Sequence, residues 1–234
     1  MEKYFKNLGD SLSLKGKAYE NIKLQIVKGN LKPGERLLEE KLSKVMNISR
    51  APIREAFNRL EKEGFVTIIP RKGAMVSNIT TKEIENIFEI REAIEPLAAK
   101  KSFSKLSITE LNKMGKKFEE FMDTPVDNEN RIQYSELDEK FHISIVKNCD
   151  NEKIIELLSN FEEHVRWFRA FYPNKFSFNW SIKEHLGIID TIKNNDEELF
   201  IKRLIQHLRS SKQHLLSEID YWRLQKKNQN EYKK

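Results

Sequence analysis

Apolar residues recur at helical spacing over most of this chain, and the clearest case lies between residues 49 and 63. One face of this segment repeats at i, i+3, i+4 and i+7, the spacing of a buried helical face, through Ile53, Ala56, Phe57 and Leu60. Ser49 is a suitable N-cap, and Pro52 falls in the first turn, where its missing N–H costs no hydrogen bond. Gly64 suits a left-handed C-terminal cap. The pattern therefore predicts a helix over residues 49–63.

A second stripe of this helix is polar and lies away from the apolar face. It consists of Arg50, Arg54 and Asn58, which follow one another at i and i+4. Arginine pairs with O6 and N7 of guanine and asparagine pairs with adenine, so this stripe can read a DNA major groove. Amphipathic helices with solvated arginines are also common, and the helix alone supports DNA binding only weakly.

The segment behind this helix strengthens the DNA-binding interpretation. Residues 65–69 are rich in β-forming side chains, residues 70–73 form a turn, and residues 74–77 form a second short strand. The predicted hairpin carries Arg71, Lys72 and Gly73 at its tip. A hairpin with two cations at its tip, directly behind a recognition helix, has the form of a wing.

The preceding residues complete a winged helix-turn-helix domain over residues 1–79. Residues 1–14 lack periodicity and are expected to form a mobile arm. Helices are predicted over residues 15–29 and 38–46, separated by a turn over residues 31–37 that contains Pro33 and Gly34. Two helices, a recognition helix and a β-hairpin is the element order of that domain.

From Thr80 onward the pattern is helical alone, so the fold class is mainly α. Thr80 or Thr81 can cap a first helix that runs past Ala98, with a kink expected at Pro96. Five more helices are predicted over residues 107–121, 130–147, 151–172, 174–193 and 196–224. Their short connections predict an antiparallel α-helical bundle over residues 80–234.

Charge is distributed unevenly between these two parts. Residues 1–79 contain 16 Lys and Arg against 9 Asp and Glu, whereas residues 80–234 contain 26 against 27. A basic segment joined to a near-neutral body indicates a module that binds a polyanion such as double-stranded DNA. No apolar run is long enough to span a membrane, the N-terminus does not resemble a signal peptide, and the single Cys149 fits a reducing cytoplasm.

The bundle carries a candidate metal-binding set. Asp138 and His142 are four residues apart and share one face of a helix, while His185 and His207 lie on two later helices. One carboxylate and three imidazoles can bind a divalent transition metal such as Zn, Ni, Mn or Fe, with open positions for water or ligand. The alternative is that Asp138 pairs locally and the histidines are scattered, because only the Asp138–His142 spacing is constrained by the sequence.

The N-terminal part resembles the DNA-binding domain of GntR-family bacterial transcription regulators. The resemblance covers roughly residues 15–78 and is carried by Pro33-Gly34-Glu35-Arg36-Leu37, Glu39, Leu42, the run from Ser49 to Ala56, Leu60, Glu63-Gly64 and Arg71-Lys72-Gly73. It implies that Arg50 and Arg54 contact bases and that the wing approaches the minor groove. Some members place another base-contacting arginine in the second helix, where this chain has Glu40, so its operator is expected to differ.

The C-terminal part resembles the FCD type of effector domain, found in the FadR-like subfamily. Segments 137–142, 184–190 and 207–208 carry the likeness, which implies that Asp138, His142, His185 and His207 hold a metal. Segment 91–99 resembles the first helix of that domain, which implies that Arg91 points into the pocket and pairs with an acidic effector. The alternative for Arg91 is a local pair with Glu95. His164 and His214 match no ligand position and are interpreted as packing or surface residues.

An aromatic cluster between residues 167 and 180 has two open interpretations. It either lines a ligand pocket or belongs to the core or a dimer contact, and it comprises Trp167, Phe168, Phe171, Tyr172, Phe176, Phe178 and Trp180.

Together these observations predict a regulator that binds a pseudo-palindromic operator as a homodimer and responds to a small carboxylate effector bound at the metal. A regulator that senses the metal itself is the alternative. A metalloenzyme is disfavoured because no further acid or base motif accompanies the ligand set.

Overall fold

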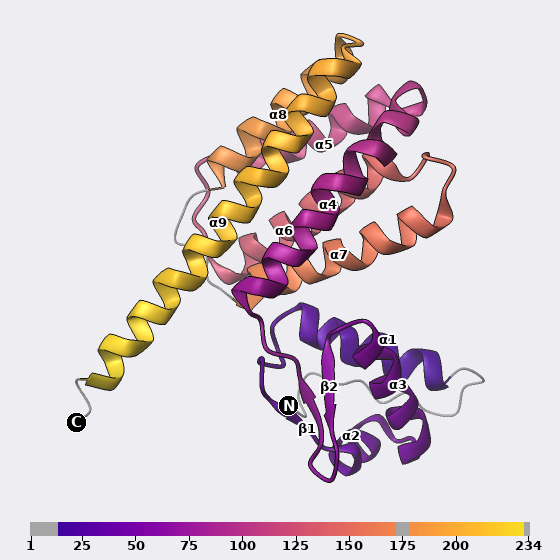
Figure 1. Cartoon of the computed structure of the whole chain (residues 1–234), viewed down its shortest axis with the longest axis vertical. Coiled ribbons are helices and arrows are strands. Elements are labelled where there is room, and N and C mark those ends of the chain that lie inside the picture. The colour runs from indigo at the N-terminus through magenta and orange to yellow at the C-terminus, as the bar shows by residue number, and fades with distance from the viewer. Residues whose placement is uncertain (1–13, 172–177, 232–234) are drawn as a thin grey trace. The chain divides into compact units, whose positions relative to one another are not determined.

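The computed structural model describes residues 14–171 and 178–231. The chain divides into two compact units, with the boundary between Ile79 and Thr80. Each unit has its own buried hydrophobic residues and is described by itself. Figure 1 shows the helices and strands of both units. The mainly α fold class, with a winged helix-turn-helix followed by a helical bundle, is confirmed.

The first unit packs its helices around the recognition helix. Its helices are α1 (Leu14–Val27), α2 (Glu39–Met46) and α3 (Arg50–Lys62), and α1 and α2 both pack against α3. The predicted apolar face of α3 is buried, since Ile53, Phe57 and Leu60 are at most 2% exposed. Ser49 occupies the N-cap position without a capping side-chain hydrogen bond. Gly64 has φ +84°, which confirms the predicted left-handed ending.

The wing is part of a three-stranded antiparallel sheet. Strands β2 (Val66–Ile69) and β3 (Gly73–Val76) form the predicted hairpin, with Ile69 opposite Gly73 at its tip. Gly73 adopts φ +89°, a conformation that glycine tolerates without strain. A third strand, β1 (Arg36–Leu37), pairs with the other edge of β3. It lies in a segment expected to be a turn, and two residues are too few to show a strand periodicity.

The second unit is a bundle of helices with capped ends. Its elements are α4 (Thr81–Ser102), a 3₁₀ turn (Phe103–Lys105), α5 (Ile108–Glu120), α6 (Asn128–Val146), α7 (Glu152–Phe171), α8 (Asn179–Lys193) and α9 (Glu197–Glu231). The hydroxyl groups of Thr80 and Ser107 accept capping hydrogen bonds at the starts of α4 and α5, and the side chain of Asn151 caps α7. The last helix extends beyond its predicted end at residue 224, and the predicted start at residue 174 lies outside the described residues.

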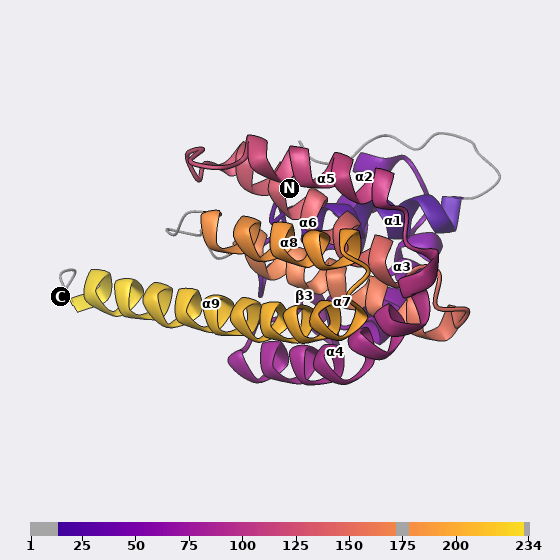
Figure 2. The ribbon, with the colours of Figure 1, turned by 90° about the horizontal axis from the view of Figure 1, so that it is seen from above.

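The helices of this bundle enclose one interior. Helix α4 packs against α9, α9 against α8, α8 against α5, α5 against α6, and α6 against α4, while α7 lies against α6 and α4. Seen from above, α9 runs between α4 and α8, with α5 beyond α8 (Figure 2). Helix α4 continues through Pro96 to Ser102. Among the described helices, none combines the length and hydropathy needed to span a membrane.

Candidate metal centre and nucleic-acid interface

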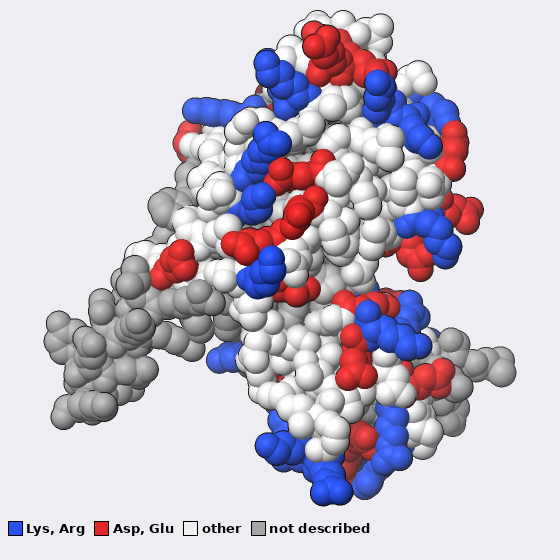
Figure 3. Space-filling model, viewed as in Figure 1, with Lys and Arg blue, Asp and Glu red and all other residues white. Residues whose placement is uncertain are grey.

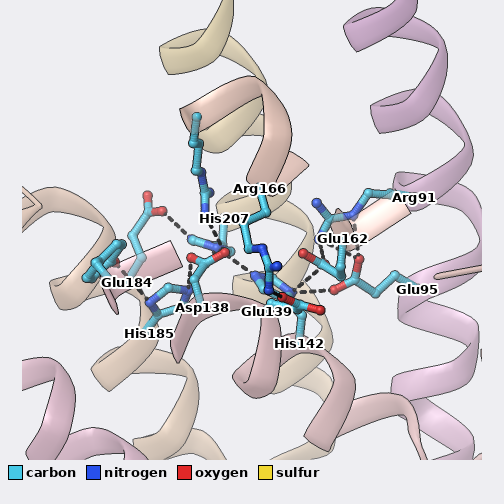
Figure 4. A network of polar contacts seen from close by, with 12 residues as sticks. Arg91, Glu95, Asp138, Glu139, His142, Glu162, Arg166, Glu184, His185 and His207 are labelled. Atoms are coloured by element: carbon cyan, nitrogen blue, oxygen red, sulfur yellow. Dashed lines mark hydrogen bonds and ion pairs between the residues drawn. The ribbon is translucent and has the colours of Figure 1, made fainter. Parts of the chain in front are cut away.

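The four predicted metal ligands meet inside the bundle. Asp138 and His142 lie one turn apart on α6, His185 lies on α8 and His207 on α9, and none is more than 2% exposed. The Nε2 atom of His207 lies 3.2 Å from Nε2 of His142 and 3.1 Å from Nε2 of His185. Oδ1 of Asp138 lies 3.4 Å from Nε2 of His185. Figure 4 shows the three imidazoles and the carboxylate directed at one point.

The other ring nitrogen of each histidine has a partner of its own. Nδ1 of His142 lies 2.5 Å from Oε1 of Glu95, and Nδ1 of His207 lies 2.8 Å from Oε2 of Glu184. An ionised carboxylate can only accept a hydrogen bond, so both Nδ1 atoms carry the proton. Nδ1 of His185 lies 3.4 Å from the hydroxyl of Tyr134, a group able to donate or accept.

With these partners in place, the side-chain atoms that face the centre cannot satisfy one another by hydrogen bonds. With Nδ1 protonated, the Nε2 atoms of His142 and His207 present lone pairs to each other at 3.2 Å, an arrangement that needs a proton or a cation between them. Within the described part of the chain, buried Oδ1 of Asp138 has no hydrogen-bond partner, although buried polar atoms are normally satisfied. A divalent transition metal fits this donor set, because imidazole and carboxylate ligands suit such ions.

The electrostatics of the centre are consistent with cation binding. Burial lowers the pKa of His185 and of His207, so both imidazoles stay neutral at neutral pH, as metal ligands must be. Burial acts to raise the pKa of Asp138, but the Arg169 guanidinium and the three site histidines together outweigh it and hold that pKa below its usual range. For His142, burial is outweighed by Glu162 and Glu95, which raise its pKa, so a metal would replace a proton there.

Arg91 lies beside this centre and is engaged by two carboxylates. Its side chain is 2% exposed and donates to Glu95 at 3.0 Å and to Glu162. The local pair with Glu95 is therefore present, and it is fully buried. A role of Arg91 in binding an acidic effector stays a prediction.

A cavity borders the centre on the side of Asp138. Arg169 on α7 pairs with Oδ2 of Asp138 and also faces this cavity. The indole of Trp180 stacks on the imidazole of His214 with ring centroids 3.9 Å apart. Burial raises the pKa of Glu218, another cavity residue, to about 7. The complete lining consists of Arg131, Tyr134, Ser135, Arg169, Phe178, Trp180, Ser181, Ser211, His214, Leu215 and Glu218.

The aromatic cluster divides between cavity and interior. Phe178 and Trp180 line the cavity, whereas Trp167 and Phe168 are at most 1% exposed. His164 is buried with Nδ1 2.9 Å from the carbonyl oxygen of Asn160, which confirms a packing role. His214, interpreted as a packing or surface residue, stacks on Trp180 and is part of the cavity wall. The side chain of Phe171, and Tyr172 and Phe176, lie outside the described residues.

Sequence reasoning missed several residues of the centre. Glu184 directly precedes His185, and Glu95 lies one turn from Arg91. A search for carboxylates next to the predicted site residues could have found both, because a metal-bound imidazole usually donates its other N–H to such a group. Tyr134 lies four residues before Asp138 on the same helix, so helical spacing could have found it as well. Arg169 and Glu162 carry no such signal, because they lie on α7, which contributes no predicted ligand.

The predicted DNA-reading residues form an exposed surface on the first unit. Ser49, Arg50, Arg54 and Asn58 are exposed on or before α3, and Arg71, Lys72 and Gly73 are exposed at the end of the hairpin. On the face shown in Figure 3, lysine and arginine atoms gather where Figure 1 places α2 and the β2–β3 hairpin.

Two glutamates from the first turn of α2 pair with the arginines of α3. Nε of Arg54 donates to Oε2 of Glu39 at 2.8 Å, and Nη2 of Arg50 lies 3.5 Å from Oε2 of Glu40. Glu40 also lies 3.1 Å from Nζ of Lys44. Both arginines remain more than half exposed, so their guanidinium groups are accessible to a partner.

Comparison with known proteins agrees with both units. Residues 14–76 match the family described as bacterial regulatory proteins, gntR family, and residues 86–210 match the FCD domain. The chain is 28% identical over 198 residues to the uncharacterised HTH-type transcriptional regulator YdhC of Bacillus subtilis, covering 84% of this chain and 88% of that protein. It is 28% identical over 192 residues to the gluconate operon transcriptional repressor of Bacillus licheniformis, covering 80% and 78%.

A solved structure shares the fold over most of the chain. Escherichia coli McbR/YncC superposes with a TM-score of 0.74 over 89% of this chain and 100% of that one, at 20% identity. The relatives and both matched domains are those of transcription regulators and not of enzymes. The chain is therefore a DNA-binding transcription regulator of the GntR family with a C-terminal FCD domain.

Proposed function

We propose that this regulator binds a pseudo-palindromic operator as a homodimer and that a small carboxylate, bound at a metal held by Asp138, His142, His185 and His207, changes its affinity for DNA. The observation that carries the proposal is the meeting of these four donor atoms beside a cavity that contains arginine. The protein would act in the cytoplasm, where its DNA is.

DNA recognition would be divided between α3 and the wing. Arg50, Arg54 and Asn58 would contact base edges in the major groove. Ser49, Arg71, Lys72 and Gly73 would contact the sugar-phosphate backbone or the minor groove, since phosphate contacts position a reader without specifying sequence. One winged domain makes few base contacts, so two copies on a two-fold related site would supply the specificity.

The effector would be recognised by the metal and a guanidinium together. A bound metal would supply Lewis-acid coordination to one carboxylate oxygen of the effector. Arg169 borders the cavity and holds Asp138, and a guanidinium has further N–H donors suited to a carboxylate. We assign the pairing to Arg169 ahead of Arg91, because Glu95 and Glu162 already engage Arg91. A gluconate operon repressor among the relatives agrees with this class, since gluconate is a small hydroxy acid.

The switch would be a population shift between two conformations of the dimer. An effector changes DNA affinity only if it binds the DNA-competent and incompetent conformations with different affinities. Trp180 and His214, which stack in the cavity wall, and Arg169 are the groups that an effector would contact first.

The test is fluorescence anisotropy with DNA selected from a random library. Metal-loaded protein is titrated with that DNA in the presence of gluconate or of mono- and dicarboxylates of two to six carbons, with the matching alcohols as uncharged controls. At least one acid is expected to shift the DNA Kd at a concentration at which it occupies the cavity. Arg169→Gln is expected to abolish the shift. Acids that bind in the cavity and leave the DNA Kd unchanged would contradict the switch.

A metal sensor is a second candidate because four protein donors could hold the ion without an effector. In that case the DNA Kd would change on removal of the metal and no carboxylate would be needed. Metal analysis after dialysis separates the two candidates, because a sensor site must exchange its ion whereas a cofactor site stays filled.

A further inference from the structure

A second group of buried acidic residues lies directly beside the metal centre. Glu95 on α4, His142 on α6 and Glu162 on α7 place one ligand atom each within 4.8 Å of one another, and none is more than 2% exposed. Figure 4 shows this group sharing His142 with the first one. Its carboxylates pair with Arg91 and His142, neither of which lines the cavity.

This group is not a second metal site, because its cation is already present. Nε and Nη2 of Arg91 both lie 3.0 Å from Oε2 of Glu95, and Nη2 also pairs with Oε1 of Glu162. The guanidinium thus bridges the two carboxylates. A divalent ion at the same place would be repelled by a fully buried positive charge that has no water to screen it.

We propose that Glu95 is the positioning residue for the metal ligand His142, and that Arg91 and Glu162 hold Glu95 in the orientation this requires. The inference rests on the proposed metal site and adds the residues that prepare it. It also gives Arg91 a different task from the effector contact implied by family resemblance.

The two carboxylate oxygens of Glu95 have different partners. Oε1 accepts the Nδ1–H of His142 at 2.5 Å, and Oε2 accepts the Nε–H of Arg91 at 3.0 Å and forms an ion pair with its Nη2. With both oxygens engaged, the carboxylate cannot rotate without losing a buried hydrogen bond. His142 is thereby held as the Nδ1–H tautomer, with the lone pair of Nε2 directed at the point where Asp138, His185 and His207 meet. A carboxylate that accepts the N–H of a metal-bound imidazole fixes the orientation of the ring and raises its basicity.

Arg91 lowers the free-energy cost of burying these two carboxylates within the bundle. Two carboxylates buried side by side would repel each other, and each would lose its hydration. Arg91 lies one helical turn before Glu95 on α4, so one helix supplies both the carboxylate and the cation that balances it. Glu162 enters from α7 and completes the ring of charges around the guanidinium.

The experiment measures zinc affinity by competition with a chromophoric chelator, using the full chain. Glu95→Gln keeps the shape of the side chain, but its amide can present either a donor or an acceptor to Nδ1, so the tautomer is no longer enforced. Its zinc Kd is expected to rise about 10- to 100-fold. The matched control is Glu139→Gln, which removes a carboxylate that pairs across α6 and α7 with Arg166 instead of with a ligand histidine. Its zinc Kd is expected to stay at the wild-type value.

A second measurement does not depend on the variant folding. Long-range ¹H–¹⁵N spectra of histidine-labelled wild-type protein report which ring nitrogen carries a proton. In zinc-loaded protein, His142 is expected to be protonated at Nδ1 and metal-bound at Nε2. Zinc on Nδ1, or a Glu95→Gln protein that binds zinc as tightly as wild type, would overturn the inference and leave the metal site standing. Wild-type protein that binds no divalent metal would overturn the metal site and this inference together.

Discussion

Nε of Arg54 donates to Oε2 of Glu39 across 2.8 Å, which ties the recognition helix to the first turn of α2. The contact uses the Nε edge of the guanidinium and leaves the Nη edge accessible, and Arg54 is 65% exposed. Exposed ion pairs contribute about 0–1 kcal/mol, so this one matters little for stability. Its effect is to orient the arginine.

Glu39→Gln is therefore expected to change DNA specificity more than stability. Removing a negative charge near DNA strengthens binding to all sequences, while the less constrained Arg54 discriminates less well at the base it reads, by about 10-fold. Sequence selection and anisotropy on matched and mismatched sites measure both effects. Glu40→Gln is the control, because Glu40 pairs with Arg50 and Lys44 instead. Equal losses of discrimination at the Arg54 base in both variants would refute the orienting role.

Truncation of the α3 arginines and truncation of the wing lysine should affect DNA affinity and sequence preference differently. Arg50→Ala or Arg54→Ala is expected to cost roughly 1–3 kcal/mol on the selected site and to relax preference at one base pair. Lys72→Ala is expected to weaken binding to all sequences about equally and to reduce the salt slope by about 1. Anisotropy over a range of salt concentrations checks this. A uniform loss for Arg54→Ala would place Arg54 among the phosphate contacts.

Removal of the metal should destabilise the protein. An ion that binds only the folded state contributes about 2.7 kcal/mol at 100 times its Kd, and its loss leaves the Nε2 lone pairs of His142 and His207 facing each other. Thermal melts with and without a chelator are expected to show a lower Tm after chelation. His185→Gln should abolish that difference, because His185 is one of the four donors.

His164→Gln provides the matched comparison for that experiment. His164 is a buried histidine of the same unit whose Nδ1 faces the carbonyl of Asn160 and not the centre. Its replacement can lower the Tm, but the difference between chelated and loaded protein should persist. A chelator-dependent Tm that survives His185→Gln would contradict the assignment of the site.

Glu218 should make stability depend on pH between about pH 5 and about pH 8. Burial raises its pKa from 4.5 to about 7 against the opposing effect of Arg169 and Arg131, so the folded protein binds the proton more tightly than the unfolded chain does. Its stabilisation is complete below pH 4.5 and is lost as the pH rises through about 7. The wild-type Tm, measured with chelator present, should fall over this range, and Glu218→Gln should flatten the slope. Glu136→Gln, outside the cavity lining, should leave the slope unchanged.

Much of the fold could be predicted because its signals are local. The buried face of α3, the glycine after it and the cap at Thr80 depend on residues within one or two turns of each other, and the structure contains all three. The strand β1 could not be predicted, because its two residues are extended only through pairing with β3. In the bundle, the spacing of Asp138 and His142 on one helix face was equally local.

The sequence by itself determined the two-part organisation, the exposed arginine stripe and the four residue types of the candidate centre, since each follows from helical period or from family motifs. Only the tertiary structure decided that His185 and His207 meet Asp138 and His142, because helix packing across α6, α8 and α9 brings them together. It also decided that Glu162 joins the local pair of Arg91 and Glu95, and that Arg169 faces the cavity. Buried charges must find partners wherever packing supplies them, and those partners lie up to 71 positions apart in the chain.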